Sequence, residues 1–214
     1  MTIKTLKDMM KDADKAFLGG AFPIVFLDTS AIIDICKSAK EEEMKQKGKS
    51  NMLLQEVYAD HFLMNFAGKY QTIISPRTYS EITRHYCVRF NGNTKEIQDV
   101  MCPLVDKFST DYERLKEFVF DKVHDDRDRY NVYWATKLSC ADNGKKDLEG
   151  FSEVDREILD NAVLFSKYFY KDGCSARPVA IFSSDEHISK GVEMLNRMGY
   201  DNLTTISSRI KHGR

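Results

Sequence analysis

The sequence lacks an excess of charge of either sign, because 32 lysine and arginine residues stand against 33 aspartate and glutamate residues in 214. This balance excludes the bulk polycation that binds nucleic acid indiscriminately, so any nucleic-acid contact has to be local. Cysteine is also scarce: the five cysteines are odd in number, scattered, and never paired as Cys-x-x-Cys. The sequence therefore argues against a disulfide framework and a structural zinc site, and it predicts reduced thiols.

Long apolar runs are missing as well. The amino-terminal stretch mixes lysine and aspartate with its apolar residues, so it has neither the apolar core of a signal peptide nor a run that could span a bilayer. We therefore expect a cytoplasmic protein that does not contact the membrane.

The chain is organised around residues 23–34. Four apolar residues after Pro23 predict a short buried strand of a parallel sheet, and Asp28 stands at its carboxyl end. Thr29 and Ser30 can cap a helix that starts at Ala31, so the turn presents a carboxylate where open α/β sheets bind their ligands. The alternative is that Asp28 only helps to cap this helix.

The rest of the chain alternates strands and helices, which predicts a parallel sheet with right-handed crossovers. The patterns predict strands over 24–27, 72–75, 178–182 and 203–206, and helices over 2–17, 31–39, 53–66, about 78–86, 151–170 and 186–198. Residues 40–49 are charged and predict a helix end followed by a loop. We expect one domain over 1–214, with a packing helix within 1–20 and a helical insertion over about 91–150, whose apolar stripes (97–108, 115–123 and 132–138) predict separate helices.

Four acids occupy equivalent places in this pattern. Asp28 and Asp185 end apolar strands, and Glu81 and Asp155 lie in the early turns of helices. Clustered carboxylates repel one another and raise one another's pKa, so they persist mainly where a cation neutralises them. Carboxylates suit Mg²⁺ or Mn²⁺, whereas zinc prefers His or Cys, and no helical pair of histidines is present. For Asp155 the structural alternative is a capping box with Ser152.

With these residues in place, the sequence resembles the PIN-domain ribonucleases, a group related to the flap endonucleases. The similarity covers roughly residues 22–90 and 151–207 and rests on four ordered motifs: Leu27-Asp28-Thr29-Ser30 with Asp34; Pro76, Tyr79, Glu81 and Ile82; Asp155, Ile158 and Ala162; Ile181, Ser183, Ser184 and Asp185. The segment between the two regions is longer than in the compact toxin members of the family.

The resemblance implies a PIN-like three-layer α/β/α sandwich around a parallel sheet of about four to five strands. It also implies an endoribonuclease that leaves a 5′-phosphate. The catalytic and metal-binding residues would be Asp28, Glu81, Asp155 and Asp185, which would hold one or two Mg²⁺ or Mn²⁺ ions. Asp34, Ser183 and Ser184 are candidates for the outer shell. RNA is the expected partner. Whether the protein also binds an antitoxin protein or forms a homodimer remains open.

RNA binding needs cations and aromatic stacking surfaces. Arg84 and Arg89 follow Glu81 on the same predicted helix and adjoin the proposed site, which makes them the first candidates for RNA contact. Two further mixed clusters lie within 127–134 and 209–214. The alternative for each cluster is a solvated helix face or tail.

Competing site types fail on particular residues. A phosphotransferase of the haloacid-dehalogenase type needs a second aspartate two residues after the first, where this chain has Ser30. A metal-dependent adhesion site needs a serine four residues after the aspartate, where this chain has Ile32. A catalytically silent module that kept the fold for RNA binding or protein interaction remains the alternative, although none of the four acids is missing.

Overall fold

The computed structural model describes residues 2–17, 23–47, 52–89, 94–120, 151–168 and 178–210. They form seven helices and six strands, so the protein is of the mixed α/β class, as predicted. The helices are α1 (Leu6–Ala16), α2 (Thr29–Lys47), α3 (Met52–Lys69), α4 (Pro76–Arg89), α5 (Thr94–Phe120), α7 (Glu153–Tyr168) and α8 (Glu186–Arg197).

Four strands build the central sheet in the order β3-β2-β4-β5: β2 (Ile24–Leu27), β3 (Gln71–Ile73), β4 (Val179–Phe182) and β5 (Leu203–Ile206). All neighbouring pairs are parallel, which confirms the predicted parallel sheet. In register, Leu27 faces Phe182 and Phe182 faces Ile206. The carboxyl ends of the strands therefore meet at one edge, and the acids that follow β2 and β4 emerge together.

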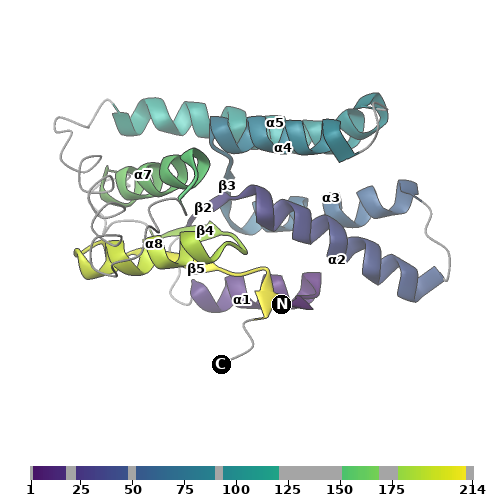
Figure 1. The fold of residues 1–214 in the computed structure, drawn as a ribbon, viewed down its shortest axis with the longest axis horizontal. Coiled ribbons are helices and arrows are strands. Elements are labelled where there is room, and N and C mark those ends of the chain that lie inside the picture. Colours follow the sequence, from purple (N-terminus) through teal and green to yellow (C-terminus); the bar gives the residue numbers. More distant parts are fainter. Residues whose placement is uncertain are drawn as a thin grey trace.

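Helices cover both faces of this sheet. Along β2, Val25 and Leu27 enter a core shared with α1, α2 and α3, whereas Ile24 and Phe26 enter a core shared with α7 and α8. Continuous apolar strands are what a sheet buried on both faces requires. Figure 1 shows α7 and α8 on one side of the sheet and α2 and α3 on the other. This arrangement is compatible with the predicted three-layer α/β/α fold.

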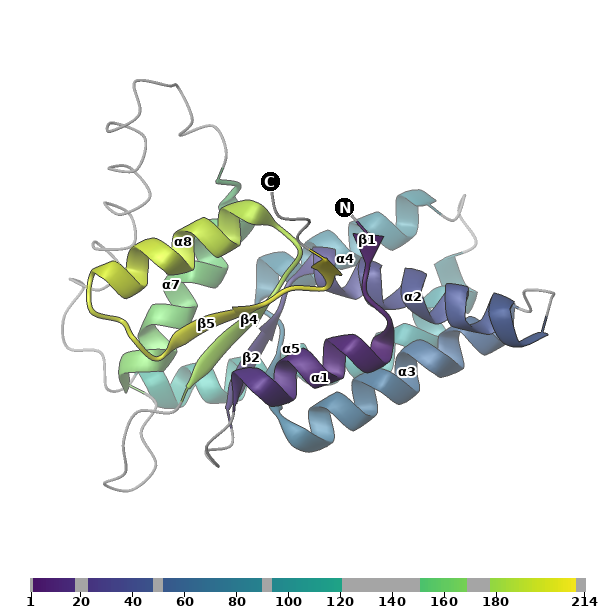
Figure 2. The ribbon, with the colours of Figure 1, turned by 90° about the horizontal axis from the view of Figure 1, so that it is seen from below.

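The predicted amino-terminal helix is wrong in its first residues. Thr2–Ile3 forms strand β1, which pairs antiparallel with β6 (Arg209–Ile210), and the helix begins only at Leu6 behind the capping residue Thr5. Figure 2 shows β1 and β6 side by side above the main sheet. The helical spacing of Ile3 was misleading because its partner lies at the far end of the sequence.

Two predicted boundaries are also wrong. Residues 40–47 were expected to be a helix end and loop, but α2 continues through them to Lys47, packed against α3, and Glu42 accepts a hydrogen bond from the N–H of Leu6 (3.1 Å). The first two helices expected in the insertion form one helix, α5, which packs beside β3. Its buried side chains at 105, 108, 112 and 119 make one continuous stripe that links both cores. Of the predicted insertion over about 91–150, residues 91–93 and 121–150 lie outside the described residues.

No described helix is both long enough and apolar enough to cross a bilayer. The side chain of Cys36, half-buried in α2, is a thiol, in agreement with the prediction for that residue.

Candidate active site

Asp28 lies at the carboxyl end of β2 and is 5% exposed. Its N–H donates to the carbonyl of Phe182 (3.0 Å), which continues the β2–β4 pairing by one residue. Its own carbonyl accepts from the N–H groups of Ala31 (3.1 Å) and Ile32 (3.2 Å), which begin α2. The sheet and the helix together fix the backbone of this acid.

Two hydroxyl groups fix its side chain. Ser30 Oγ and Ser183 Oγ donate to the same oxygen, Asp28 Oδ2, at 2.6 and 2.7 Å. The N–H of Ser184 in turn donates to Ser30 Oγ (2.9 Å). The turns that follow β2 and β4 are thus joined around the Asp28 carboxylate, and of the predicted outer-shell residues Ser183 binds it directly and Ser184 binds it through Ser30.

Asp185 belongs to the same network. Its N–H donates to Ser183 Oγ (2.9 Å), so one hydroxyl connects Asp185 to Asp28. Its carboxylate caps α8, because Oδ1 accepts from the N–H of His187 (2.7 Å) and lies 3.2 Å from His187 Nδ1. The two acids at strand ends therefore lie at the same edge of the sheet, as the sequence predicted.

Glu81 is held beside them by Thr29. Thr29 Oγ1 donates to Glu81 Oε2 at 2.5 Å. Because Thr29 directly follows Asp28, this bond ties a glutamate on α4 to the turn after β2.

Asp155 is buried in the first turn of α7 and forms the predicted capping box. The N–H of Ser152 donates to Asp155 Oδ2 (2.7 Å), and the N–H of Asp155 donates to Ser152 Oγ (3.1 Å). The structural alternative for Asp155 is thus present. It does not exclude a second role, since Asp155 also lies close enough to Asp28 and Asp185 to be influenced by their charges.

Electrostatics connect the four acids. The pKa of Asp155 is raised to about 6: burial is the largest cause, the negative charges of Asp185 and Asp28 add to it, and the hydrogen bonds from Ser152 oppose it. Burial also raises the pKa of Asp28, the hydroxyls of Ser30 and Ser183 lower it, and the charge of Glu81 raises it. The acids therefore repel one another as ionised groups, which is the condition that a bound cation relieves.

The donor chemistry of this cluster fits a hard divalent cation. The hydrogen bonds given above fall on one oxygen of each carboxylate: Oδ2 of Asp28, Oε2 of Glu81, Oδ2 of Asp155 and Oδ1 of Asp185. Among the described residues, no group of three or more Asp, Glu, His and Cys side chains could hold a metal ion as the side chains stand. Mg²⁺ usually keeps several of its waters and is bound by only one or two carboxylates, so the other acids of the cluster would act on it through water.

Asp34, predicted as an outer-shell residue, forms an ion pair with Arg209, and Arg209 is also influenced by the charge of Asp185. Asp34 is 0% exposed and binds Arg209 through both oxygens, with Nε at 2.7 Å from Oδ2 and Nη2 at 3.0 Å from Oδ1. Ser208 Oγ also donates to Oδ2 (2.8 Å). Asp34 therefore ties α2 to the carboxy-terminal segment.

The predicted RNA contacts are only partly described. Arg84 is exposed on α4, one turn beyond Glu81, in agreement with its predicted position. Arg89 ends α4, and its side chain lies outside the description, as do the predicted cluster at 127–134 and residues 211–214 of the predicted cluster at 209–214. Arg209, the described cation of that last cluster, binds Asp34.

Sequence reasoning missed the side-chain roles of Thr29 and Ser30, which it had treated as helix caps. Their signal was a pair of hydroxyl residues directly after the strand-end acid. It also missed Arg77 on α4, which forms ion pairs with Glu153 and, at 3.1 Å, with Glu157 of α7. No local pattern marks that contact, because its partners follow about 80 residues later.

A separate hollow of about 490 Å³ lies between α1, α2 and α3. Its lining is mostly apolar, with Leu6, Met10 and Phe62 among the contributors, and it includes none of the four acids. The acids thus form a site distinct from this groove.

Comparisons with models of protein families, with curated proteins and with solved structures found no significant match for this chain.

Proposed function

We propose that the protein is an Mg²⁺- or Mn²⁺-dependent endoribonuclease of the PIN type. The observation that carries the proposal is the gathering of Asp28, Glu81, Asp155 and Asp185 at the carboxyl edge of a parallel sheet. There, burial and mutual repulsion raise the pKa of Asp28 and Asp155. The preference for RNA rests on the motif resemblance and on the exposed Arg84 near Glu81.

In this proposal the four carboxylates hold the ion directly or through water. A bound divalent ion would supply an activated water and stabilise charge on the phosphate oxygens. Ser30 and Ser183 orient the Asp28 carboxylate by binding Oδ2, and Thr29 orients Glu81 in the same way. The backbone N–H of Ser152 donates to the Asp155 carboxylate in the first turn of α7. These hydrogen bonds restrain the side chains of Asp28, Glu81 and Asp155 before an ion binds.

The protonation of Asp155 adds a pH condition. With a pKa of about 6, its carboxylate is largely charged only above that pH in the metal-free protein. Cation binding and RNA cleavage should therefore increase as the pH rises through about 6.

The test is cleavage of single-stranded RNA by the purified full chain. We expect cleavage with Mg²⁺ or Mn²⁺ and none in a chelator. Asp28→Asn, which removes the charge and keeps the size, should lower the rate by at least about 10- to 100-fold, the loss typical when even an outer-shell partner of a metal ligand is removed. The matched control is Asp201→Asn, an exposed acid next to the amino end of β5, which should leave the rate unchanged.

Cleavage that persists in the chelator would contradict the metal requirement. Binding of RNA without cleavage under any metal condition would instead support the catalytically silent module.

A further inference from the structure

The four acids are held in place by two different means. Asp28 and Asp185 follow β2 and β4, whose backbone pairing fixes their separation. Glu81 and Asp155 come from α4 and α7, and no backbone ladder connects those two helices to each other. Their separation has to be set by side chains.

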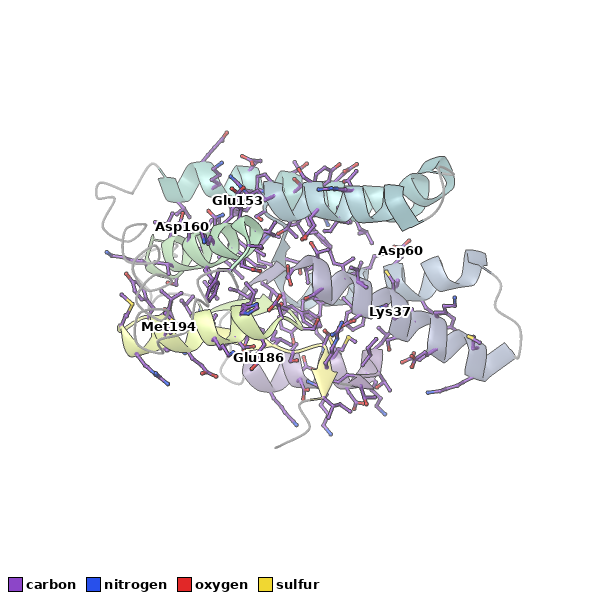
Figure 3. All side chains as sticks on the ribbon, in the orientation of Figure 1. Lys37, Asp60, Glu153, Asp160, Glu186 and Met194 are labelled. Carbon is purple, nitrogen blue, oxygen red and sulfur yellow. The ribbon has the colours of Figure 1, made fainter. Side chains whose placement is uncertain are left out.

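Arg77 makes that connection. Its Nη1 forms an ion pair with Glu153, its Nε lies 3.1 Å from Glu157 Oε2, and its backbone N–H donates to Glu157 Oε1 (3.0 Å). Three contacts from one residue therefore join the first turn of α4 to the first two turns of α7. Figure 3 shows Glu153 at the end of α7 that faces α4 and α5.

The positions along each helix make this contact relevant to the site. Glu81 lies four residues after Arg77, about one turn along α4. Asp155 lies between Glu153 and Glu157 in α7. A shift between the two helix ends would therefore move Glu81 relative to Asp155.

The charges are also arranged for this pairing. An arginine in the first turn of a helix is unfavourable toward the helix dipole, whereas glutamates in the early turns of α7 are favourable. The contacts with Glu153 and Glu157 offset the unfavourable placement of Arg77. Glu157 is only 22% exposed, although Arg77 is 50% and Glu153 78% exposed.

We propose that Arg77 is a positioning residue. Its contacts with Glu153 and Glu157 hold α4 against α7 and thereby set the affinity of the four-acid site for its divalent ion. This inference rests on the proposed function. It adds that the cation site is completed by an arginine that touches none of the four carboxylates in the contacts described.

The sign of the effect separates this role from plain electrostatics. Arg77 carries a positive charge near a cation site, so its removal alone should make a divalent ion bind more tightly. Loss of the contacts that Arg77 makes with Glu153 and Glu157 should make the ion bind more weakly, because the separation between Glu81 on α4 and Asp155 on α7 is then less firmly fixed. A direct contact with RNA, the other common role of an exposed arginine, predicts no change in ion binding measured without RNA.

The experiment is a calorimetric titration of the full chain with Mn²⁺ in the absence of RNA. We expect Arg77→Ala to weaken Mn²⁺ binding about two- to five-fold, the range that an exposed ion pair supports. Arg77→Lys keeps the charge but lacks the forked geometry that contacts two glutamates. Its affinity for Mn²⁺ should therefore lie between those of the wild-type protein and Arg77→Ala. The control is Arg114→Ala, which removes an exposed arginine paired with Asp111 within α5 and should leave binding unchanged.

If the wild-type protein binds Mn²⁺ and Arg77→Ala binds it equally well or more tightly, the inference about Arg77 is wrong, and the proposed function is unaffected. A wild-type protein that binds no Mn²⁺ would overturn the proposed function together with the inference about Arg77. Melting temperatures of both variants, recorded without metal, should stay close to wild type, because exposed ion pairs contribute little to stability.

Discussion

At the scale of single residues, Asp155 combines two demands. Its carboxylate completes a capping box with Ser152, which favours the charged form at the start of a helix. It also lies buried within reach of the charges of Asp28 and Asp185, which favours the neutral form. The raised pKa of about 6 shows that burial and repulsion outweigh the cap.

This balance predicts how stability depends on pH in the metal-free protein. The folded protein binds a proton at Asp155 more tightly than the unfolded chain does, because the pKa is about 6 in the fold against a model value of 3.8. The free energy of unfolding should therefore fall as the pH rises from about 4 through about 6. In Asp155→Asn the free energy of unfolding should decrease less over this pH range. The variant should be at least as stable as wild type at pH 7, and Mn²⁺ should stabilise it less than it stabilises wild type. Melting curves across this pH range, with Mn²⁺ or chelator, measure both effects.

Ser152→Ala is the matched control. It removes the hydroxyl of the cap and leaves the charge, so it should lower stability by about 0.5–2 kcal/mol at every pH and preserve the response to Mn²⁺. If Asp155→Asn behaved like Ser152→Ala, with lower stability at pH 7 and normal stabilisation by Mn²⁺, the acid would have only the capping role.

Three of the four acids follow a recognisable local signal in the sequence. Asp28 and Asp185 end apolar runs, and Asp155 starts a helix with a capping box. The sequence could not reveal that Thr29 reaches Glu81 or that Arg209 binds Asp34, since those partners are 52 and 175 residues apart. Asp34 was predicted as an outer-shell residue because it is near Asp28 in the chain, and the structure shows that it binds Arg209.

At the scale of elements, the pair of Asp34 and Arg209 joins α2 to β6. Asp34 is fully buried, and its carboxylate accepts two hydrogen bonds from Arg209 and one from Ser208 in place of bonds to water. Asp34 raises the pKa of Arg209 through these contacts. Strand β6 then pairs with β1, so the pair fastens both ends of the described chain beside the sheet.

Removing one partner should therefore be costly. Arg209→Ala should lower the free energy of unfolding by about 3 kcal/mol, because it leaves a buried carboxylate without its cation. Adding Asp34→Asn should recover most of this loss, since the buried charge disappears. Chemical denaturation of the two single variants and the double variant measures the coupling, and strictly additive losses would contradict it.

Elements with a strong local signal were predicted well, and errors arose where tertiary contacts decide. Apolar runs identified the strands that became β2, β4 and β5. The start of α1 was misplaced because β1 finds its partner in β6. The end of α2 was misplaced because packing against α3 extends a helix beyond what its charged sequence favours.

At the scale of the whole molecule, the parallel sheet gathers side chains from distant parts of the sequence at one edge. Strand order β3-β2-β4-β5 places the turns after β2 and β4 next to each other, and α4 and α7 bring two further acids. The local patterns predicted a parallel sheet but not this order, which depends on pairings between strands such as β2 and β4 that are far apart in the chain. The apolar groove between α1, α2 and α3 is a separate feature of the surface.

The central claim is that the four acids form one divalent-cation site. The most direct measurement is an anomalous difference map from crystals of the full chain soaked in Mn²⁺. We expect a peak within about 2.5 Å of a carboxylate oxygen of Asp28 and of at least one of Glu81, Asp155 and Asp185, and its loss in crystals of Asp28→Asn. A map with no peak at this edge of the sheet, or with Mn²⁺ bound only at carboxylates elsewhere, would contradict the claim.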